Sequence, residues 1–428
     1  MAQEKIMRLI IHRGSHEIGG TCIELIAKNS RILIDAGLPL PSADSNVSQE
    51  KIPHTLKQSL AQTNPPLKGI LISHPHQDHY GLLESLPSSI PVYAGRACAA
   101  LMKFTIGLNR NRSHWQASHT FAPEKVFQIG DFTIKPYLMD HSGFDSYAFL
   151  IKAEGKGIFY SGDFRGHGRK WKLTERLIQQ PPPPVDLLLL EGTVVGSERK
   201  EETLSEKQLE SKFINSFKNT AGAVFLTMSS QNIDRIVTVF RACKRSGRRM
   251  IIDPYTSEIL EILKEFYITL PHPSLPEIKV SYPQQLCRWL ERNGQKDLLG
   301  RHLQYGGKWS YFSENASKIV MLIRQSATTE VLNKKYFDLS KSKWIYSMWD
   351  KYLQRDKKLA ALAANFKDRG TSFEFLHTSG HADMSTLKKF ANNIKYKVLI
   401  PVHTSAPAEY KVLFKDVMVA SDGEVINV

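Results

Sequence analysis

The segment HPHQDH at residues 74–79 constrains this chain more than any other feature. It follows an apolar run at 67–73 that is typical of a buried strand, and it precedes residues 80–86, which predict a helix. This one loop carries three imidazoles and a carboxylate, the usual ligands of zinc in hydrolytic sites. Its alternation lets His74 and His76 face one metal ion while Asp78 and His79 face another. The alternative interpretation is a polar turn in which Asp78 caps the helix.

One loop cannot complete a two-metal site, so further ligands must come from other strand ends. His141, Asp163 and His403 each follow a predicted strand, beside small residues that permit close approach. A single histidine in a turn is more often a structural residue. In combination with residues 74–79, these three become candidate ligands.

The order of predicted elements indicates two interleaved domains. Strands dominate the first part of the chain, and the continuous apolar run at 185–190 is typical of a strand buried on both faces. Strands and helices then alternate, as in parallel βαβ units, before strands return at 373–376, 397–401 and 417–420. We therefore expect stacked α and β layers interrupted by an α/β insertion, with the first domain at 1–203 and 372–428 and the insertion at 204–371.

Asp35, the loop at 74–79, His141 and Asp163 occur in an order that resembles the metallo-β-lactamase fold. Three further segments resemble its β-CASP branch, the nucleases that include ribonuclease J: an acidic motif at 187–193 that contains Glu191, a second at 377–382 carried by His381, and a third at 401–403 carried by His403. The resemblance implies an α/β fold, a four-layer αββα sandwich with an inserted parallel-sheet α/β β-CASP domain. The segment at 229–235 also resembles a ribonuclease J segment that begins a helix of the insertion.

The resemblance also implies roles for individual residues. His74, His76 and His141 would hold one zinc ion, and Asp78, His79 and His403 would hold a second. Asp163 would bridge the two ions. Asp35 would orient ligands by hydrogen bonding, although a strand-end aspartate also commonly makes a turn.

Two bound zinc ions, with Mn²⁺ as the alternative metal, imply hydrolysis of a phosphodiester by a shared hydroxide. The leaving oxygen needs a proton, and His381, oriented by Glu191, is the candidate acid. The alternatives for His381 are an additional metal ligand or a donor to phosphate. The implied catalytic residues are therefore Asp78, Asp163, Glu191 and His381.

The charge of the chain favours a polyanionic partner. Lys and Arg number 57 against 42 Asp and Glu, a formal net charge of +15. A basic cluster directly follows Asp163, and its alternative interpretation is a solvated surface. The residues predicted to contact RNA or its phosphates are Ser230, Asn232, Arg235, Arg165, Arg169, Lys170, Ser379 and Gly380.

We expect cleavage of single-stranded RNA in the cleft between the two domains, in endonuclease or 5′-exonuclease mode. His403 favours RNA, because DNA-acting members of the branch usually have Val there. The alternatives are a DNA nuclease, a small-substrate metallo-hydrolase and an RNA-binding pseudo-nuclease. The last has usually lost ligands, whereas seven are present here.

The remaining expectations concern where and with what the protein works. Four widely spaced cysteines, a start unlike a secretory signal and no long apolar run predict a cytoplasmic protein that does not enter the membrane. A homodimer is left open. The chain ends soon after His403, without the C-terminal domain with which bacterial ribonuclease J assembles.

Overall fold

The computed structural model describes residues 7–40, 51–112, 114–197, 203–333 and 335–428. The chain divides into two compact units. The first comprises residues 1–103, 115–202 and 380–428, and the second comprises 104–114 and 203–379. The predicted insertion at 204–371 remains a prediction of domain organisation. By compactness, the second unit also takes in residues 104–114 and 372–379.

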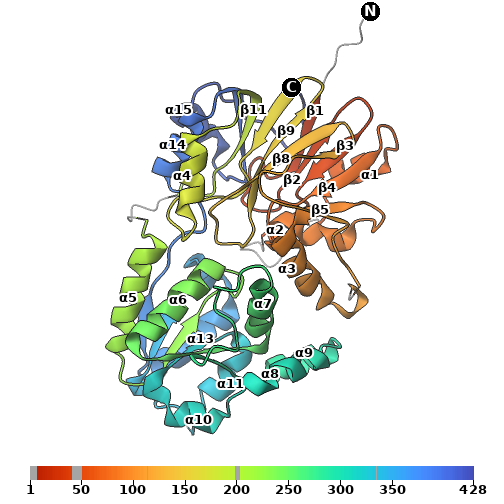
Figure 1. Cartoon of the computed structure of the whole chain (residues 1–428). Coiled ribbons are helices and arrows are strands. Elements are labelled where there is room, and N and C mark those ends of the chain that lie inside the picture. Colours follow the sequence, from red (N-terminus) through yellow and green to blue (C-terminus); the bar gives the residue numbers. More distant parts are fainter. Residues whose placement is uncertain (1–6, 41–50, 113, 198–202, 334) are drawn as a thin grey trace, which may run out of the picture. The chain divides into compact units, whose positions relative to one another are not determined.

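The first unit contains two sheets (Figure 1). The first sheet has the strand order β19 (Val425–Asn427), β1 (Arg8–Arg13), β2 (Cys22–Ile26), β3 (Arg31–Ile34), β4 (Leu67–Leu71), β5 (Val92–Gly95) and β6 (His119–Phe121). The second has the order β18 (Tyr396–Val402), β11 (Val185–Glu191), β10 (Lys156–Tyr160), β9 (Tyr147–Ala153), β8 (Phe132–Leu138) and β7 (Phe127–Ile129).

Helices cover the outer faces of the two sheets. α1 (His54–Ala61), α2 (Gln77–Tyr80) and the start of α3 (Arg96–Gly107) belong to the side of the first sheet, whereas α4 (Trp171–Gln179), α14 (Met384–Asn393) and α15 (Tyr410–Leu413) lie beside the second (Figure 1). Apolar side chains from both sheets form one buried core between them, and a second core lies beneath α4 and α14. The predicted αββα sandwich is therefore confirmed.

β11 shows why the apolar run at 185–190 is continuous. It pairs in parallel with β10 on one side and with β18 on the other, and its residues Leu187–Leu190 are buried. A central strand covered on both faces has no solvent-facing position that would favour a polar side chain. Its two partners lie far apart in the sequence, at 156–160 and 396–402, so β11 joins the two stretches of chain that flank the second unit.

The second unit contains a six-stranded sheet in which every strand pair is parallel. Its order is β14 (Ile278–Val280), β13 (Arg249–Ile252), β15 (Ile319–Leu322), β12 (Val224–Thr227), β16 (Lys343–Tyr346) and β17 (Ser372–Phe375). The helices are α5 (Glu206–Lys218), α6 (Ile233–Ser246), α7 (Pro254–Lys264), α8 (Gln284–Arg292), α9 (Lys296–His302), α10 (Trp309–Glu314), α11 (Thr328–Val331), α12 (Lys351–Arg355) and α13 (Lys357–Asp368). This unit has the parallel-sheet α/β architecture that the sequence predicted.

Candidate metal centre

The candidate site residues meet because the strands that carry them end at one edge of the sandwich. β10, β11 and β18 are mutually parallel, and β8 runs in the same direction because both β8 and β10 are antiparallel to β9. The carboxyl ends of such strands share one edge of a sheet. The residues that follow or end these four strands are His141 after β8, Asp163 after β10, Glu191 at the end of β11 and His403 after β18.

The first sheet supplies the other half of the site. β3 and β4 are parallel neighbours, and their carboxyl ends are followed by Asp35 and by residues 74–79, of which the last three begin α2. Asp35 and His403 both have positive φ angles, of 58° and 53°. A non-glycine residue in this left-handed region carries backbone strain that the surrounding structure must hold, and such strain is concentrated at functional sites.

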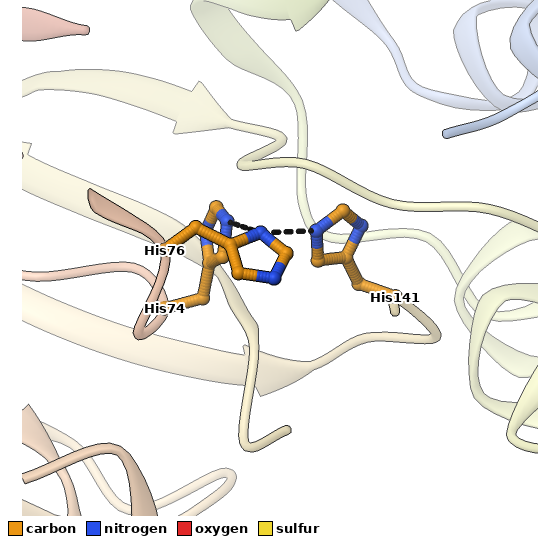
Figure 2. A group of neighbouring side chains, drawn as sticks. All are labelled: His74, His76 and His141. Carbon is orange, nitrogen blue, oxygen red and sulfur yellow. Dashed lines mark hydrogen bonds between the residues drawn. The ribbon is translucent and has the colours of Figure 1, made fainter. Parts of the chain in front are cut away.

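Three imidazoles form the first group of candidate ligands. Nδ1 of His76 lies 3.1 Å from Nε2 of His74 and 3.2 Å from Nε2 of His141 (Figure 2). One neutral ring nitrogen carries a single proton or a single lone pair, so it cannot make a good hydrogen bond to both neighbours. Nitrogen ligands of a tetrahedral zinc ion lie about 3.3 Å apart, which is close to the observed spacing.

The environment of this group keeps the rings uncharged and close together. Burial holds the pKa of His74 and of His141 well below the usual value of imidazole, and it lowers the pKa of His76 to about 4. Metal ligation requires a neutral imidazole, so no proton need be displaced at neutral pH. Gly143 packs against all three rings: a Cβ at this position would lie 3.2 Å from an atom of each.

The second group combines two imidazoles with two carboxylates. Nε2 of His79 lies 3.1 Å from Oδ2 of Asp163, and Nε2 of His403 lies 3.3 Å from Oδ2 of Asp78. One ligand atom from each of the four residues lies within 4.8 Å of the others. Nitrogen and oxygen donors at such spacing can hold a zinc-class ion.

Asp163 lies between the two groups. Its Oδ2 is 3.8 Å from Nε2 of His74 in the first group and 3.1 Å from Nε2 of His79 in the second. Among the described residues, its buried Oδ1 has no hydrogen-bond partner. A buried polar atom is rarely left in this state, and a metal ion beside Asp163 would satisfy it. The residues present therefore fit a two-metal centre.

The electrostatics of the second group also favour a cation. Burial alone would lower the pKa of His79, but Asp163 and Asp35 outweigh it and raise that pKa well above the usual value. Burial opposes ionisation of Asp163, yet His403 and His79 hold its pKa well below the usual range. The cluster of carboxylates thus attracts positive charge, which a divalent ion would supply.

Asp35 fixes the orientation of His79. Its Oδ2 accepts hydrogen bonds from Nδ1 of His79, from the Ser73 hydroxyl and from the Tyr160 hydroxyl, each at 2.8 Å. A carboxylate can only accept here, so Nδ1 carries the ring proton and Nε2 is left to face Asp163. A hydrogen bond of this kind sets the tautomer and the ring plane of a metal-binding histidine.

His381 lies beside two carboxylates, those of Glu191 and of Asp163, which belongs to the second group. Its Nδ1 is 3.5 Å from Oε2 of Glu191 and 3.8 Å from Oδ2 of Asp163. Burial alone would lower the pKa of His381, but Glu191 and Asp163 raise it to about 9. The side chains of His381 and Asp78 keep 20% and 18% of their exposed area, whereas those of His79 and Asp163 keep 0% and 3%. The centre is therefore open to solvent at His381 and Asp78.

Sequence analysis missed three residues that contact these groups. Ser73 and Tyr160 bind Asp35, and the hydroxyl of Thr193 lies 3.1 Å from Nδ1 of His381 and 2.9 Å from Nδ1 of His403. Thr193 lies at the end of the acidic motif at 187–193, but no role was assigned to it from the sequence. Nothing in the sequence distinguishes Ser73 or Tyr160 from ordinary residues of a strand end.

The residues predicted to contact RNA are placed in different environments. Arg165 is fully buried with its Nε 3.6 Å from Oδ1 of Asp140, and Arg235 is fully buried against Glu206. Ser230 is buried against Thr256, and Asn232 caps α6. As placed, Arg165, Arg235 and Ser230 are buried and have structural roles, whereas Asn232 is half-buried at the start of α6.

The other predicted contacts lie nearer the surface. Lys170 is half-buried, and its Nζ donates to the carbonyl of His141 at 3.2 Å. Arg169 is half-buried beside it. Gly380 belongs to the first unit, where a Cβ would lie 2.5 Å from Oγ of Ser142, and the half-exposed Ser379 belongs to the second.

A protein-family comparison agrees with this architecture. A model described as a beta-lactamase superfamily domain matches residues 30–247, which is more than half of the chain. The chain belongs to the metallo-β-lactamase superfamily. The matched span contains Asp35, the ligand candidates from His74 to Asp163, and Glu191. His381 and His403 lie beyond it.

Two curated relatives are similar to this chain over nearly all of its length. Ribonuclease J of Helicobacter pylori strain 26695 is 25% identical over 91% of this chain and 55% of its own length. Ribonuclease J of Mycoplasma genitalium is 21% identical over 99% of this chain and 74% of its own. The chain thus spans about half the length of the Helicobacter relative.

A solved structure shows the same fold. A crystal structure of a protein of unknown function from Enterococcus faecalis V583 superimposes with a TM-score of 0.79, covering 99% of this chain and 100% of that one at 17% identity. Among the described residues, we find no helix with the length and apolar character needed to span a membrane.

Proposed function

We propose that this protein is a β-CASP ribonuclease that hydrolyses phosphodiester bonds of single-stranded RNA with two zinc ions. The observation that carries the proposal is the pair of ligand groups that converge on Asp163. The similarity to proteins named ribonuclease J supports the choice of RNA. Mn²⁺ is the alternative metal, because carboxylate and imidazole ligands suit it as well.

The proposal assigns each ligand group to one ion. His74, His76 and His141 would hold the first, and Asp78, His79 and His403 would hold the second. Asp163, whose carboxylate lies between the groups, would serve both. Two such ions supply a nucleophile of lowered pKa and stabilise negative charge on the phosphate.

The protein's own residues supply the proton. His381 holds a proton at neutral pH because the carboxylates of Glu191 and Asp163 raise its pKa to about 9. The backbone N–H groups of Thr193 and Ala382 donate to Glu191 at 3.0 and 3.4 Å, which fixes the carboxylate beside the ring. The imidazolium then donates to the leaving oxygen as general acid.

Substrate binding follows from charge. The net charge of +15 favours a polyanion, and Lys170 donates to the carbonyl of His141, close to the first ligand group. Arg169, its neighbour in sequence, is proposed as a second phosphate contact. Ser379 and Gly380, which precede His381, are proposed as phosphate contacts. His403, a ligand candidate, is the residue that favours RNA over DNA in this branch.

The other functions that the sequence left open make different predictions. A DNA nuclease would cut DNA at least as fast as RNA, and a pseudo-nuclease would bind RNA without cutting it. A small-substrate hydrolase would not need the second unit with its six-stranded sheet. Association into a homodimer is a separate proposal, which sedimentation would test.

The deciding experiment uses one RNA labelled at its 5′ end and the same RNA labelled at its 3′ end, each with a 5′-monophosphate or a 5′-triphosphate. Purified protein loaded with zinc should cut the RNA much faster than DNA of the same sequence, and the products distinguish endonuclease from exonuclease mode. His54→Ala, which removes an exposed histidine, is the matched control for His76→Ala. Equal rates of wild type and His76→Ala would contradict the proposal.

A further inference from the structure

The hydroxyl of Thr193 contacts two functional rings at once. Its Oγ1 lies 2.9 Å from Nδ1 of His403 and 3.1 Å from Nδ1 of His381. His403 belongs to the second ligand group, and His381 is the proposed proton donor. The two rings stack against each other, with centroids 5.5 Å apart and planes 23° apart.

The chemistry of a hydroxyl permits both contacts together. A threonine hydroxyl has one hydrogen and two lone pairs, so it can accept from both rings, or accept from one while donating to the other. In either case Nδ1 of each ring is occupied. Nε2 of His403 is then the nitrogen left for the ligand group, where it lies 3.3 Å from Oδ2 of Asp78.

The backbone around Thr193 holds this hydroxyl in place. The N–H of Thr193 donates to Oε2 of Glu191 at 3.0 Å, and the carbonyl of Glu191 accepts from the hydroxyl of Tyr410 at 2.8 Å. Gly192 has no room for a side chain, because a Cβ there would lie 1.9 Å from the same Tyr410 oxygen. Thr193 therefore sits on a turn that is fixed from two sides.

We propose that Thr193 is a positioning residue that holds the rings of His403 and His381 through one shared hydroxyl, and so couples binding of the second metal ion to placement of the proton donor. This inference rests on the proposed function. Thr193 carries no charge and is not one of the proposed metal ligands. Loss of the hydroxyl should disturb both rings together.

The test is Thr193→Val, which has nearly the same shape as Thr193 and lacks the hydroxyl. Zinc affinity is measured by competition with a chromophoric chelator, without RNA. We expect weaker binding of the second ion by roughly 10- to 100-fold, the usual effect of removing the hydrogen-bond partner of a ligand. The kcat for RNA should fall by about the same factor, while KM changes by less than about threefold.

Two further variants separate the hydroxyl from packing. Thr193→Ser keeps the hydroxyl and should restore both metal affinity and kcat to within about threefold of wild type. Thr220→Val deletes a buried hydroxyl in the second unit, which donates to the Ser216 carbonyl, and should leave both quantities unchanged. If Thr193→Val fails to fold, Thr193→Ala serves in its place.

Three results would overturn the proposal. The first is wild-type zinc affinity and kcat in Thr193→Val, and the second is a Thr193→Ser variant as impaired as Thr193→Val. The third is loss of zinc affinity without loss of kcat, or the reverse, because the shared hydroxyl serves both rings. If the wild type binds two ions and cuts no RNA, the proposed function fails, yet the zinc measurement still decides whether Thr193 supports the second ion.

Discussion

Asp35 and His79 share a buried hydrogen bond of 2.8 Å between Oδ2 and Nδ1, and this bond leaves Nε2 of His79 3.1 Å from Oδ2 of Asp163. Asp35 itself touches neither group of ligand atoms directly. It acts through the ring of His79 and through Ser73 and Tyr160, which share the same carboxylate oxygen. The geometry of the second ligand group thus depends on a residue behind it.

Asp35→Asn should therefore weaken metal binding without removing a ligand. An amide cannot accept three hydrogen bonds at one oxygen as a carboxylate does, so the ring of His79 loses its fixed orientation. We expect zinc affinity at the second group to fall by roughly 10- to 100-fold. Chelator competition measures this, with Asp186→Asn, a half-buried aspartate paired with Lys397, as control. Unchanged affinity in Asp35→Asn would refute the orienting role.

His76→Ala should remove one metal ion. The side chain supplies the central nitrogen of the first group, and two remaining imidazoles do not complete a tetrahedral site. Metal analysis should fall from close to two zinc-class ions per chain to close to one, and RNA cleavage should be lost. The circular dichroism spectrum should not change, because the sheet cores do not include this side chain. Two ions in the variant would exclude His76 as a ligand.

His381→Ala and His403→Ala should fail in different ways. His381→Ala should keep both zinc ions and bind RNA normally, while kcat falls by roughly 10²- to 10⁴-fold, the usual contribution of a positioned acid. His403→Ala should lose the second ion, and excess zinc should partly restore its activity. Equal loss of metal in both variants would place His381 among the ligands instead.

The pH dependence of cleavage follows from the direction of the shift at His381. Its pKa in the folded protein is raised to about 9, so the ring is protonated below that pH and loses the proton as pH rises through it. The acid is the active form, so kcat should fall on the alkaline side. Glu191→Gln removes the largest charge that raises this pKa, and the alkaline limb should move to lower pH. An unmoved limb would show that another group controls it.

Substitution of Arg165 should affect the stability of the protein, whereas substitution of Lys170 should affect its binding of RNA. Arg165 is buried beside Asp140, and removal of one partner of a buried pair typically costs about 3–5 kcal/mol. Arg165→Ala should therefore lower Tm markedly. Lys170→Ala should instead leave Tm nearly unchanged and reduce the slope of log K against log salt by about one. A purely RNA-binding defect in Arg165→Ala would mean that its buried position is wrong.

The sequence predicted the parts of the site whose spacing is local. Residues 74–79 are contiguous, from the loop after β4 into the start of α2, and their residue types alone indicated two groups of ligands. Thr193 could not be recognised as a contact of His403, because 210 positions separate them and only the pairing of β11 with β18 brings them together. The burial of Arg165 was likewise invisible, since an arginine after a ligand reads equally well as a surface cation.

Some secondary-structure elements were also predicted wrongly, because their ends and pairings depend on contacts that the local sequence does not show. Residues 417–420 were predicted as a strand, but Val417 makes only an isolated bridge to Leu399, so this prediction was wrong. Residues 80–86 were predicted as a helix, whereas α2 ends at Tyr80 and a 3₁₀ turn follows at Gly81–Ser85. Strands such as β6 and β19 were missed because three residues carry too little alternation to be recognised.

The pairing of β11 with β18 also sets an order of events during synthesis. The strands that hold His74, His76 and His141 have all left the ribosome by the time residue 160 has emerged, so the first ligand group can assemble early. His403 follows β18, which cannot join β11 until the whole second unit has been made. Until β18 has been made and has paired with β11, the second ligand group lacks His403. The proposed nuclease would therefore be unable to bind its second ion, and so to cut RNA, before residues 396–403 are in place.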